Sequence, residues 1–548
     1  MTTMIQTLAF LAAAAVQPAD LAGVWSAQRD YGPANVRAAV IVTRESAWTS
    51  RTIWLPGKNR LRLSYAHGQL LGQLVQAGNA EDSSPVASPA RVTALGENRW
   101  RVDARPLRDV QHLELHIRAR ADGTVEAFFR NPERNAGARI GLRSLHLDER
   151  TIHLSRAEHS DIVGNWSPEQ KTLTFTGLGL PGTFVFTKHA LPPPLKYRYR
   201  RPAPGGDGWP TGTLRGGGFD EARIAALVDR IRATPQDVAA PDVQSLLVAR
   251  HGKLVLDEYF NGYDADRPHD VRSAGKSVAT LLIGEAIEET HSFSAESPIA
   301  TILTRYAPFA NDDAQKERIS VADLMSMSAG YACDDNDDDS PGGEDRMQSQ
   351  TAQPDWYKFT LDLPMLFAPG SQAFYCSAEI NLLGAIAEQT TGEPLAEFFY
   401  DKFARPMNFG PYGMWLMPPP RETAYMAGGD RFRPRDFLKF GQLFLDQGHW
   451  KGRRVIDASW LRECATKHSY VKGGGGDYGY GWHLLDFPQN DRTFHAINAG
   501  GNGGQLLYII PELDMTVMIT AANYGQYPIW SKFGEDIVGA GILPAVLR

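Results

Sequence analysis

A proline- and glycine-rich stretch divides this 548-residue chain into two parts with different hydrophobic patterns. It contains Leu191-Pro-Pro-Pro194 and Arg201-Pro-Ala-Pro-Gly-Gly-Asp-Gly208, and we predict a linker over residues 191–218. A single hydrophobic core stops growing at roughly 250–300 residues, so the length of the chain also favours two domains.

Short runs with alternating apolar residues recur before the break, as in Thr124-Val-Glu-Ala-Phe-Phe129 and Thr183-Phe-Val-Phe186. This pattern is typical of short antiparallel strands. Asp20-Leu-Ala-Gly-Val-Trp25 is echoed by Asp161-Ile-Val-Gly-Asn-Trp166, and a glycine ahead of a buried tryptophan suits a β-barrel or sandwich. We predict an all-β domain of barrel or sandwich type over residues 19–190, without catalytic residues.

Residues 219–548 combine strands with helices. Two apolar strand pairs stand near the ends of this segment: residues 244–249 with 253–259, and 505–510 with 515–520. Helical spacing of apolar residues fills most of the sequence between them, beginning with a long apolar helix from Ser273 to Glu289. This order predicts an α+β domain whose antiparallel sheet is built from both ends of the segment.

The N-terminus and the charge bear on location and partners. An apolar run from Leu8 to Val16, followed by Gln17-Pro-Ala19, is typical of a signal peptide, although no Lys or Arg precedes it. We expect residues 1–18 to be a signal peptide and the protein to be periplasmic or secreted. The alternative is a frayed N-terminal helix in a cytoplasmic protein.

The net charge of −7 does not favour nucleic acid or anionic membranes as partners, and no segment is long and apolar enough to span a membrane.

The first chemical motif is Arg272-Ser273-Ala-Gly-Lys276, at the start of the long apolar helix. A serine hydroxyl needs a neighbouring base to become a nucleophile, and residues three apart share one face of a helix. S-x-x-K therefore places the amine of Lys276 beside Ser273, while the helix N-terminus favours negative charge there. The alternative is a capping Ser273 with a solvated Lys276.

Two further motifs suit a catalytic cleft. Tyr375 stands at the entrance of a predicted helix over residues 378–391, where a phenol near a lysine can move protons; the alternative is a tyrosine packed in the core. Asn498-Ala-Gly-Gly-Asn-Gly-Gly-Gln505 leads into a strand. Its glycines allow the close approach that an oxyanion hole requires, and the alternative is a flexible loop.

The order of these three motifs resembles that of serine β-lactamases and penicillin-binding proteins. Within that superfamily the sequence is most similar to class C β-lactamases, family VIII carboxylesterases and 6-aminohexanoate-dimer hydrolases. Supporting phrases are Met325-Ser-Met-Ser-Ala-Gly-Tyr331 and Arg435-Asp-Phe-Leu-Lys-Phe-Gly441. The resemblance covers residues 210–548 and implies a β-lactamase/transpeptidase-like domain, with an antiparallel sheet flanked by helices plus an all-helical insertion.

The resemblance also implies roles for individual residues. Ser273 is the acylated nucleophile, Lys276 the proton acceptor or relay, and Tyr375 the group that carries protons to the leaving group. The backbone N–H groups of Ser273 and Asn502 form the oxyanion hole. Ser377 stands where these families have Asn or Ser in a substrate-binding position.

Ala499-Gly500-Gly501 stands where the families have Lys-Thr-Gly, with Gly501 as a substrate-binding residue. The missing lysine removes charge-assisted capture of a substrate carboxylate, which favours an esterase or amidase over a lactamase. Tyr331 and Trp356 are candidate walls of the substrate pocket; both are equally compatible with the core.

Cys333 and Cys376 lie near motifs that the resemblance brings together, so in an exported protein they can form a disulfide; the alternative is two separate thiols. The acidic segment over residues 333–345 lacks the spacing of a calcium loop. We expect it to be a solvated loop near the cleft that repels anionic substrates.

The sequence thus predicts a serine hydrolase that cleaves a small-molecule ester or amide through an acyl-enzyme on Ser273, without a metal or another cofactor. Two alternatives stay open. One is a β-lactamase or D-alanyl-D-alanine carboxypeptidase. The other is a penicillin- or peptidoglycan-binding sensor without turnover. The sequence does not predict the oligomeric state.

Overall fold

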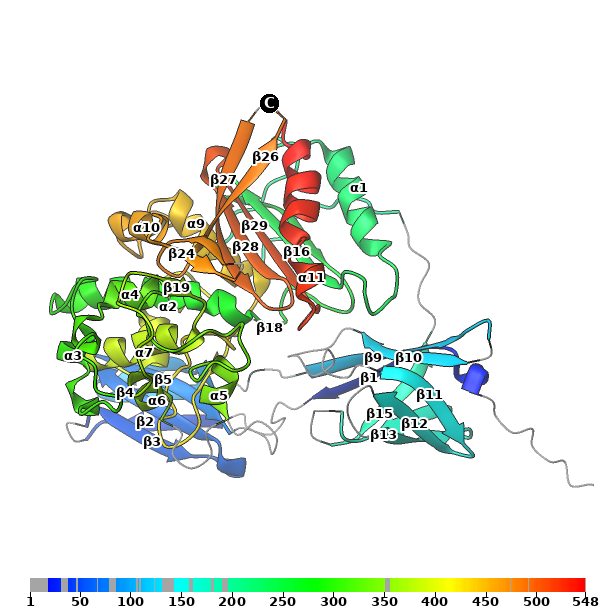
Figure 1. The fold of residues 1–548 in the computed structure, drawn as a ribbon, viewed down its shortest axis with the longest axis horizontal. Coiled ribbons are helices and arrows are strands. Elements are labelled where there is room, and N and C mark those ends of the chain that lie inside the picture. Colours follow the sequence, from blue (N-terminus) through cyan, green and yellow to red (C-terminus); the bar gives the residue numbers. More distant parts are fainter. Residues whose placement is uncertain are drawn as a thin grey trace, which may run out of the picture. The chain divides into compact units, whose positions relative to one another are not determined.

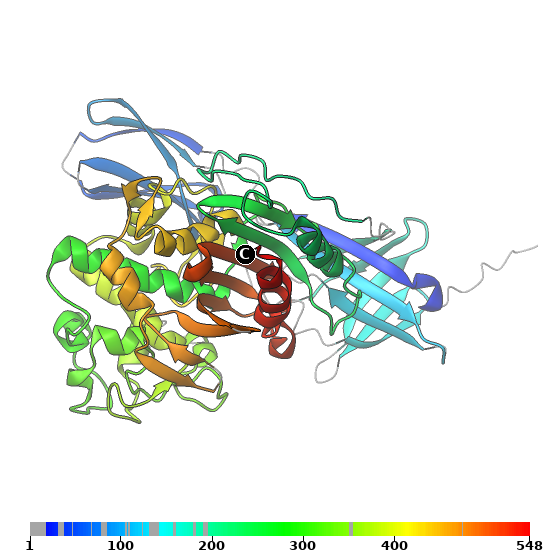
Figure 2. The same ribbon diagram turned by 90° about the horizontal axis from the view of Figure 1, so that it is seen from above.

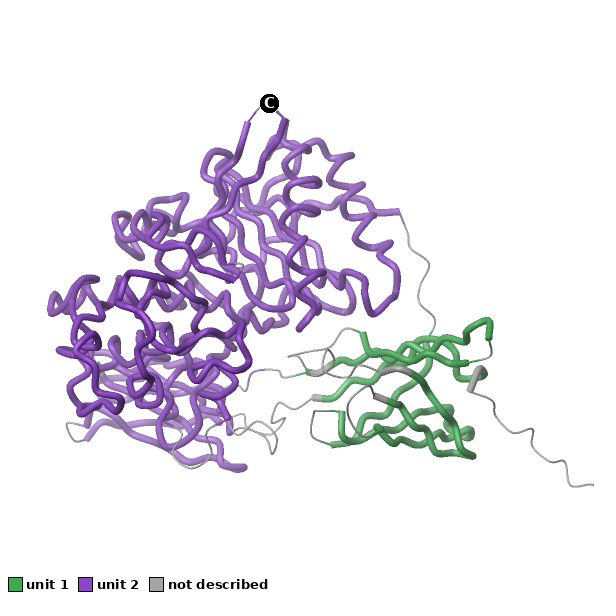
Figure 3. The backbone as a smooth tube through the Cα atoms, in the orientation of Figure 1, with its two compact units in different colours: residues 1–29, 110–193 green, residues 30–109, 194–548 purple. Residues whose placement is uncertain are grey.

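The computed structural model divides the chain into two compact units, residues 1–29 with 110–193 and residues 30–109 with 194–548 (Figure 3). It describes residues 18–30, 38–45, 48–66, 68–77, 85–104, 107, 110–122, 124–130, 142–156, 161–178, 182–189, 196–349, 355–473, 475–490 and 492–547. The expected signal peptide lies outside these residues apart from Pro18. None of the helices they form has the length and apolar character needed to cross a membrane.

The smaller unit is an eight-stranded antiparallel sheet with the order β10-β9-β1-β15-β14-β13-β12-β11. Its strands are β1 (Gly23–Asp30), β9 (Val110–Ala119), β10 (Val125–Arg130), β11 (Leu142–Asp148), β12 (Thr151–Arg156), β13 (Ile162–Ser167), β14 (Thr172–Phe175) and β15 (Phe184–His189). The two outermost strands, β10 and β11, lie against each other, so the sheet forms a nearly closed barrel. The all-β prediction for this part of the chain is confirmed.

The two echoed tryptophans meet inside the barrel. The Trp25 and Trp166 rings pack edge to face with their centroids 5.8 Å apart. A Cβ atom on Gly164 would lie 2.3 Å from the ring of Phe175, so only glycine leaves room for that ring. The glycine that precedes Trp166 therefore serves the packing of the neighbouring strand.

The strands between residues 38 and 104, together with one later strand, form two small sheets that belong to the larger unit. One has the order β2-β8-β7, and the other has the order β20-β6-β5-β4-β3. Their strands are β2 (Ala38–Thr43), β3 (Ser50–Trp54), β4 (Arg60–Ala66), β5 (Gln69–Gln76), β6 (Val86–Pro89), β7 (Arg91–Gly96), β8 (Arg99–Ala104) and β20 (Met414–Trp415). We call residues 30–109 the inserted sheets.

The inserted sheets are held to the C-terminal part of the chain by backbone pairing and by ion pairs. Strand β6 pairs with β20, with Met414 opposite Ala87. The guanidinium of Arg62 donates two hydrogen bonds of 2.8 Å to the carboxylate of Glu397, whose side chain is 1% exposed. These contacts explain why residues 30–109 group with residues 194–548, whereas the sequence placed them in an N-terminal domain over residues 19–190.

The main sheet of the larger unit has nine strands in the order β17-β16-β29-β28-β27-β26-β25-β24-β19. They are β16 (Val243–Arg250), β17 (Lys253–Tyr259), β19 (Ala373–Phe374), β24 (Ser469–Lys472), β25 (Gly476–Tyr478), β26 (His483–Gln489), β27 (Arg492–Gly501), β28 (Gln505–Ile510) and β29 (Met515–Ala521). All neighbours are antiparallel except β19 and β24. Because β16 pairs with β29, strands from both ends of the segment meet, and the α+β prediction is confirmed.

Helices cover both faces of this sheet (Figures 1 and 2). Helix α1 (Glu221–Arg232) and the C-terminal π-helix Gly534–Ile542 lie side by side on one face. Asp220 caps α1 by accepting hydrogen bonds from the N–H groups of Ala222 and Arg223. The other face packs against α9 (Pro434–Leu445), with α2 (Gly275–Thr290) and α10 (Ala458–Cys464) beside it.

The remaining helices form the helical part of the larger unit. They are α3 (Ile299–Ile302), α4 (Val321–Met325), α5 (Glu344–Gln348), α6 (Trp356–Leu361), α7 (Ser377–Thr391) and α8 (Leu395–Phe399), and α11 (Tyr527–Trp530) follows the sheet. Short strands β18 (His269–Asp270) and β21 (Arg431–Phe432) pair with each other, as do β22 (His449–Trp450) and β23 (Arg453–Arg454).

The described part of the expected linker is packed against the larger unit. Trp209 is buried, and its Nε1–H donates a hydrogen bond of 2.7 Å to the backbone oxygen of Arg435. Asp207 forms an ion pair with the guanidinium of Arg435 at 3.2 Å. The proline and glycine content of residues 191–218 predicted a segment without regular secondary structure. It did not predict that Asp207 and Trp209 attach this segment to the larger unit.

Candidate active site

Ser273 lies in a short 3-10 turn, Arg272–Ala274, that leads directly into α2. Lys276 follows in the first turn of that helix, and its side chain is buried, with 1% exposed. Its Nζ donates hydrogen bonds to Ser273 Oγ at 2.9 Å and to the backbone oxygen of Ala427 at 2.8 Å. The i, i+3 spacing thus brings the amine and the hydroxyl into direct contact, while Ser273 itself stays partly exposed.

The backbone directly before Ser273 is held in an unusual conformation. Arg272 has a φ of 51°, in the left-handed region that a non-glycine residue rarely adopts. Two glycines pack directly against this turn: a Cβ on Gly428 would lie 2.9 Å from the carbonyl of Arg272, and one on Gly501 would lie 2.3 Å from the oxygen of Val271. Glycine at both positions therefore allows the surrounding backbone to fix the turn.

The charge state of Lys276 depends on its neighbours. Burial by itself lowers the pKa of a lysine, because it disfavours the ammonium. At Lys276 the electrostatic interactions with Tyr375, Glu344 and Asp335 outweigh this burial and raise the pKa of the amine above its ordinary value. The resting site therefore holds an ammonium ion next to Ser273.

Tyr375 lies directly before α7, and its ring centroid is 4.9 Å from Lys276 Nζ. The ring stacks on the imidazole of His483, with centroids 6.4 Å apart. His483 Nδ1 lies 2.9 Å from the oxygen of Gly475. Desolvation, followed by the positive charge of Lys276, lowers the pKa of His483, which keeps the imidazole neutral at neutral pH. The sequence analysis did not select His483, because a single histidine at a strand start carries no motif.

The acidic segment contributes a carboxylate to the structure around Tyr375. Asp335 Oδ2 accepts hydrogen bonds from the backbone N–H and the hydroxyl of Ser377, at 2.8 and 2.6 Å. Its other oxygen accepts from the N–H of Glu344 at 2.9 Å. Desolvation and the charge of Glu344 raise the pKa of Asp335 to about 6, against the lowering effects of Lys276 and Ser377. The expectation of a wholly solvated loop is therefore wrong at Asp335, although residues 336–339 are exposed.

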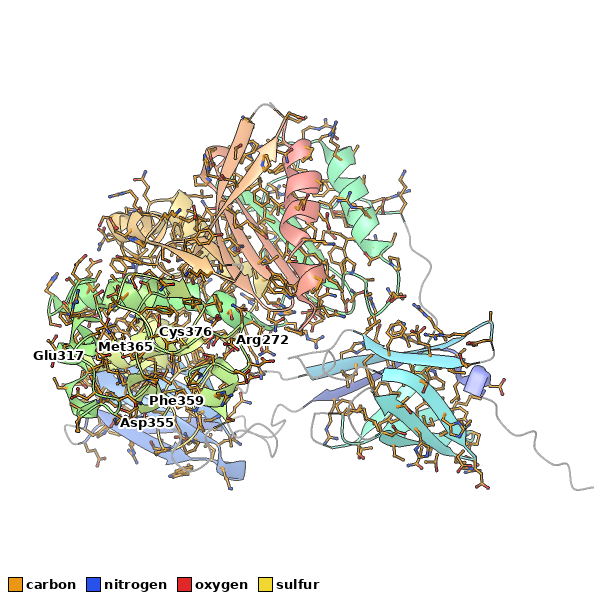
Figure 4. The ribbon with its side chains drawn as sticks, viewed as in Figure 1. Arg272, Glu317, Asp355, Phe359, Met365 and Cys376 are labelled. Carbon is orange, nitrogen blue, oxygen red and sulfur yellow. A yellow bond between two sulfur atoms is a disulfide. The ribbon has the colours of Figure 1, made fainter. Side chains whose placement is uncertain are left out.

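A disulfide between Cys333 and Cys376 joins the acidic segment to the start of α7 (Figure 4, where Cys376 is labelled). A backbone hydrogen bond of 2.8 Å from the N–H of Asp335 to the oxygen of Tyr375 lies beside it. The segment and the tyrosine are thus fixed to each other by a covalent bond and a hydrogen bond.

The glycine-rich end of β27 provides an open strand edge. Pairing of β27 with β26 ends at Asn498, opposite His483, whereas pairing with β28 continues to Gly501. In the described residues, no hydrogen bond leads from the backbone N–H of Ser273 or Asn502 to another protein group. The side chain of Asn502 accepts a hydrogen bond from Gly525 N–H at 2.8 Å. This arrangement suits the predicted oxyanion hole.

The other two candidate pocket residues are buried. Tyr331 is 3% exposed, and Trp356, which is 1% exposed, packs against the rings of Trp415 and Tyr425. Both therefore offer a substrate almost no accessible surface. Ser377 is also buried, and its hydroxyl is engaged by Asp335. Over the ranges that the structure describes, no group of three or more His, Cys, Asp or Glu residues is placed to hold a metal ion.

Comparison with known proteins finds several similar enzymes. A 6-aminohexanoate-dimer hydrolase of Paenarthrobacter ureafaciens is 25% identical over 319 residues, which are 54% of this chain and 76% of that protein. Esterase EstB of Burkholderia gladioli is 30% identical over 186 residues, 34% of this chain and 41% of EstB. A solved family VIII carboxylesterase has 17% identity and a TM-score of 0.42, covering 55% of this chain and 90% of its own.

The family comparison covers the region that contains the site. A sequence model of the Beta-lactamase family matches residues 227–527, more than half of the chain. The match includes Ser273 and Lys276, the tyrosine before α7 and the glycine-rich end of β27. The resemblance drawn from the sequence motifs is therefore confirmed. The chain belongs to the Beta-lactamase family of serine hydrolases.

Proposed function

We propose that this protein cleaves a small ester or amide through an acyl-enzyme on Ser273. The contact that carries the proposal is the hydrogen bond of 2.9 Å from buried Lys276 to Ser273 Oγ, with Tyr375 beside the same amine. The names of two similar proteins, an esterase and a 6-aminohexanoate-dimer hydrolase, agree with it.

In the proposed reaction, Tyr375 acts as a phenolate beside the Lys276 ammonium; Ser273 Oγ attacks the carbonyl carbon, and its proton passes to that phenolate. Because Lys276 is an ammonium in the resting site, it acts as a relay and as a stabilising charge for the developing alkoxide, and Tyr375 is the group that accepts the proton. The backbone N–H groups of Ser273 and Asn502 hold the carbonyl oxygen as it becomes negative. Tyr375 gives the proton to the departing alcohol or amine and is a phenolate again. Water then attacks the acyl carbon and loses a proton to Tyr375, which passes it to Ser273 Oγ as the acid is released.

The ester or amide is preferred over a β-lactam because of Ala499. This residue stands where a β-lactamase has lysine, and it is buried and uncharged. The alternatives are a β-lactamase or D-alanyl-D-alanine carboxypeptidase and a sensor that is acylated without release. Location is a separate proposal: the disulfide supports export to the periplasm or the medium, since disulfides persist in oxidising compartments.

The test is hydrolysis of p-nitrophenyl butyrate by the wild type and by Ser273→Ala, with Ser292→Ala as the control. Ser292 is an exposed serine beyond the end of α2, so its loss should leave the rate unchanged. We expect Ser273→Ala to lose turnover almost completely. Equal rates for the wild type and Ser273→Ala would refute the assignment of the nucleophile. Faster turnover of nitrocefin than of the ester would favour the β-lactamase alternative, and acylation without release would favour the sensor.

A further inference from the structure

We propose that Arg272 binds a carboxylate on the substrate, so that the preferred ester or amide is one that carries a negative charge. The inference rests on the proposed function, because it names the substrate class of the same site. It also changes two expectations from the sequence: that without the missing lysine the site does not capture a carboxylate, and that the acidic segment over residues 333–345 repels anionic substrates. The structure offers a cation from a different element.

The position of Arg272 brings its side chain next to the open strand edge. It directly precedes the nucleophile, and a Cβ on Gly501 would lie 3.1 Å from the Cβ of Arg272. Its guanidinium carbon lies 5.3 Å from the centroid of the Tyr524 ring, and this ring packs against Gly503. The guanidinium therefore lies near the end of β27, where the oxyanion hole is predicted.

The guanidinium of Arg272 has donor groups available for a ligand. Its side chain is 25% exposed, and Nε forms an ion pair with Asp270 Oδ2 at 3.4 Å without hydrogen-bond geometry. The other oxygen of Asp270 accepts from the backbone N–H of Arg272 at 2.9 Å. Asp270 thus restrains the arginine from one side. In the described residues, neither terminal nitrogen of Arg272 donates a hydrogen bond to the protein.

A guanidinium with free terminal nitrogens presents the planar fork that binds a carboxylate through two parallel hydrogen bonds. The other cation at the nucleophile cannot serve this purpose, because Lys276 is buried and donates to Ser273 and Ala427. The acyl or leaving group of a substrate that lies along Ala499–Gly501 passes next to Arg272. A carboxylate at the end of such a group is the ligand that fits the available donors.

The test measures binding and turnover separately. Monomethyl glutarate, a small ester with one carboxylate, is titrated calorimetrically into Ser273→Ala and into the same protein with Arg272→Met added. Methionine retains an unbranched apolar stem and removes the charge. The matched control is Arg267→Met, which removes a nearby arginine that lies over the ring of Tyr263. In parallel, KM for neutral p-nitrophenyl butyrate is measured for the wild type and Arg272→Met.

We expect Arg272→Met to weaken binding of monomethyl glutarate by about ten- to a hundredfold, the range of one or two charge-assisted hydrogen bonds. Arg267→Met should have less than a twofold effect, and Arg272→Lys should restore part of the affinity. Arg272→Met should raise the KM for the neutral ester by a smaller factor than it raises the dissociation constant of monomethyl glutarate.

Three results would overturn the inference. These are no binding of monomethyl glutarate to Ser273→Ala, equal binding with and without Arg272→Met, and an equal loss for the charged and the neutral ester. The last would assign Arg272 a structural role as the partner of Asp270. Failure of the proposed function would give a result distinct from these three. Monomethyl glutarate would still bind through Arg272, but neither ester would be hydrolysed.

Discussion

Replacing Glu285 with glutamine should remove a large part of the pH dependence of stability. Glu285 is buried in α2, and its Oε1 has no hydrogen-bond partner in the described part of the chain. Burial, followed by repulsion from Glu288, raises the pKa of its carboxyl group from 4.5 to about 8. The nearby cations Lys402 and Arg454 are paired with other carboxylates and offset only part of this effect.

The sign follows from the two pKa values. The unfolded chain releases the proton near pH 4.5, whereas the folded protein keeps it up to about pH 8, so raising the pH favours unfolding across this window. The free energy of unfolding should fall by about 1.4 kcal/mol for each pH unit, or about 4 to 5 kcal/mol in total. Below pH 4.5 this contribution to stability is fully present.

Urea unfolding between pH 5 and pH 9 measures the effect. Because glutamine does not titrate, Glu285→Gln should lose this slope and should unfold at higher urea concentration than the wild type at pH 9. Glu296→Gln removes an exposed carboxylate and should retain the slope of the wild type. If the wild type and Glu285→Gln show the same dependence on pH, then the carboxyl group of Glu285 is not protonated in the folded protein at neutral pH, and the reasoning is refuted.

Three further changes have expected outcomes. Gly501→Ala should lower the rate of ester hydrolysis at least tenfold, because its Cβ would lie 2.3 Å from the backbone oxygen of Val271, next to the turn that holds Ser273. Gly500→Ala, whose Cβ has its nearest contact at 3.2 Å, is the control. Equal rates for the two variants would contradict the packing argument. Cys376→Ser should lower the free energy of unfolding by about 2–4 kcal/mol, because the disulfide joins cysteines 43 residues apart and restricts the unfolded chain. Thermal unfolding of the oxidised and the reduced wild type provides the comparison. Identical unfolding curves would contradict the prediction. Glu397→Ala should lower the free energy of unfolding in urea by about 3–5 kcal/mol, because it leaves the largely buried Arg62 without its carboxylate partner. A loss below about 1 kcal/mol would show that water replaces the ion pair.

Periodicity and element order predicted most of the fold. Alternating apolar runs identified the strands of the barrel, and strand pairs at the two ends of the second segment predicted that β16 lies beside β29. Periodicity shows that a segment joins a sheet, but it does not show which sheet. Strand β6 pairs on one side with β5 and on the other with β20. Because β20 is only two residues long, Met414–Trp415, and carries no strand pattern, the sequence did not show where residues 30–109 belong.

The site was predictable where spacing alone brings groups together. Ser273 and Lys276 are three residues apart on a helix, and the structure places Nζ 2.9 Å from Oγ. Tyr375 needed a family resemblance, because no local rule relates it to the helix of the nucleophile. Asp335 and His483 were missed since their roles depend on burial. Asp335 lies in a run of acidic residues that suggests a solvated loop, and only the disulfide and the hydrogen bonds to α7 distinguish it from its neighbours.

The pairing of β6 with β20 also has a consequence for synthesis, because one edge of β6 stays open until β20 has been made. Ala87 of β6 leaves the ribosome 327 residues before Met414 of β20, its partner (414 − 87). At an elongation rate of roughly 5–20 residues per second, β6 has no partner on one side for about 16 to 65 seconds. A strand edge that waits this long is a site for pairing with other chains, so chaperone demand should centre on residues 30–109. Lys276 waits in the same way for a later segment, since the backbone oxygen of Ala427 that accepts from its amine follows 151 residues behind it.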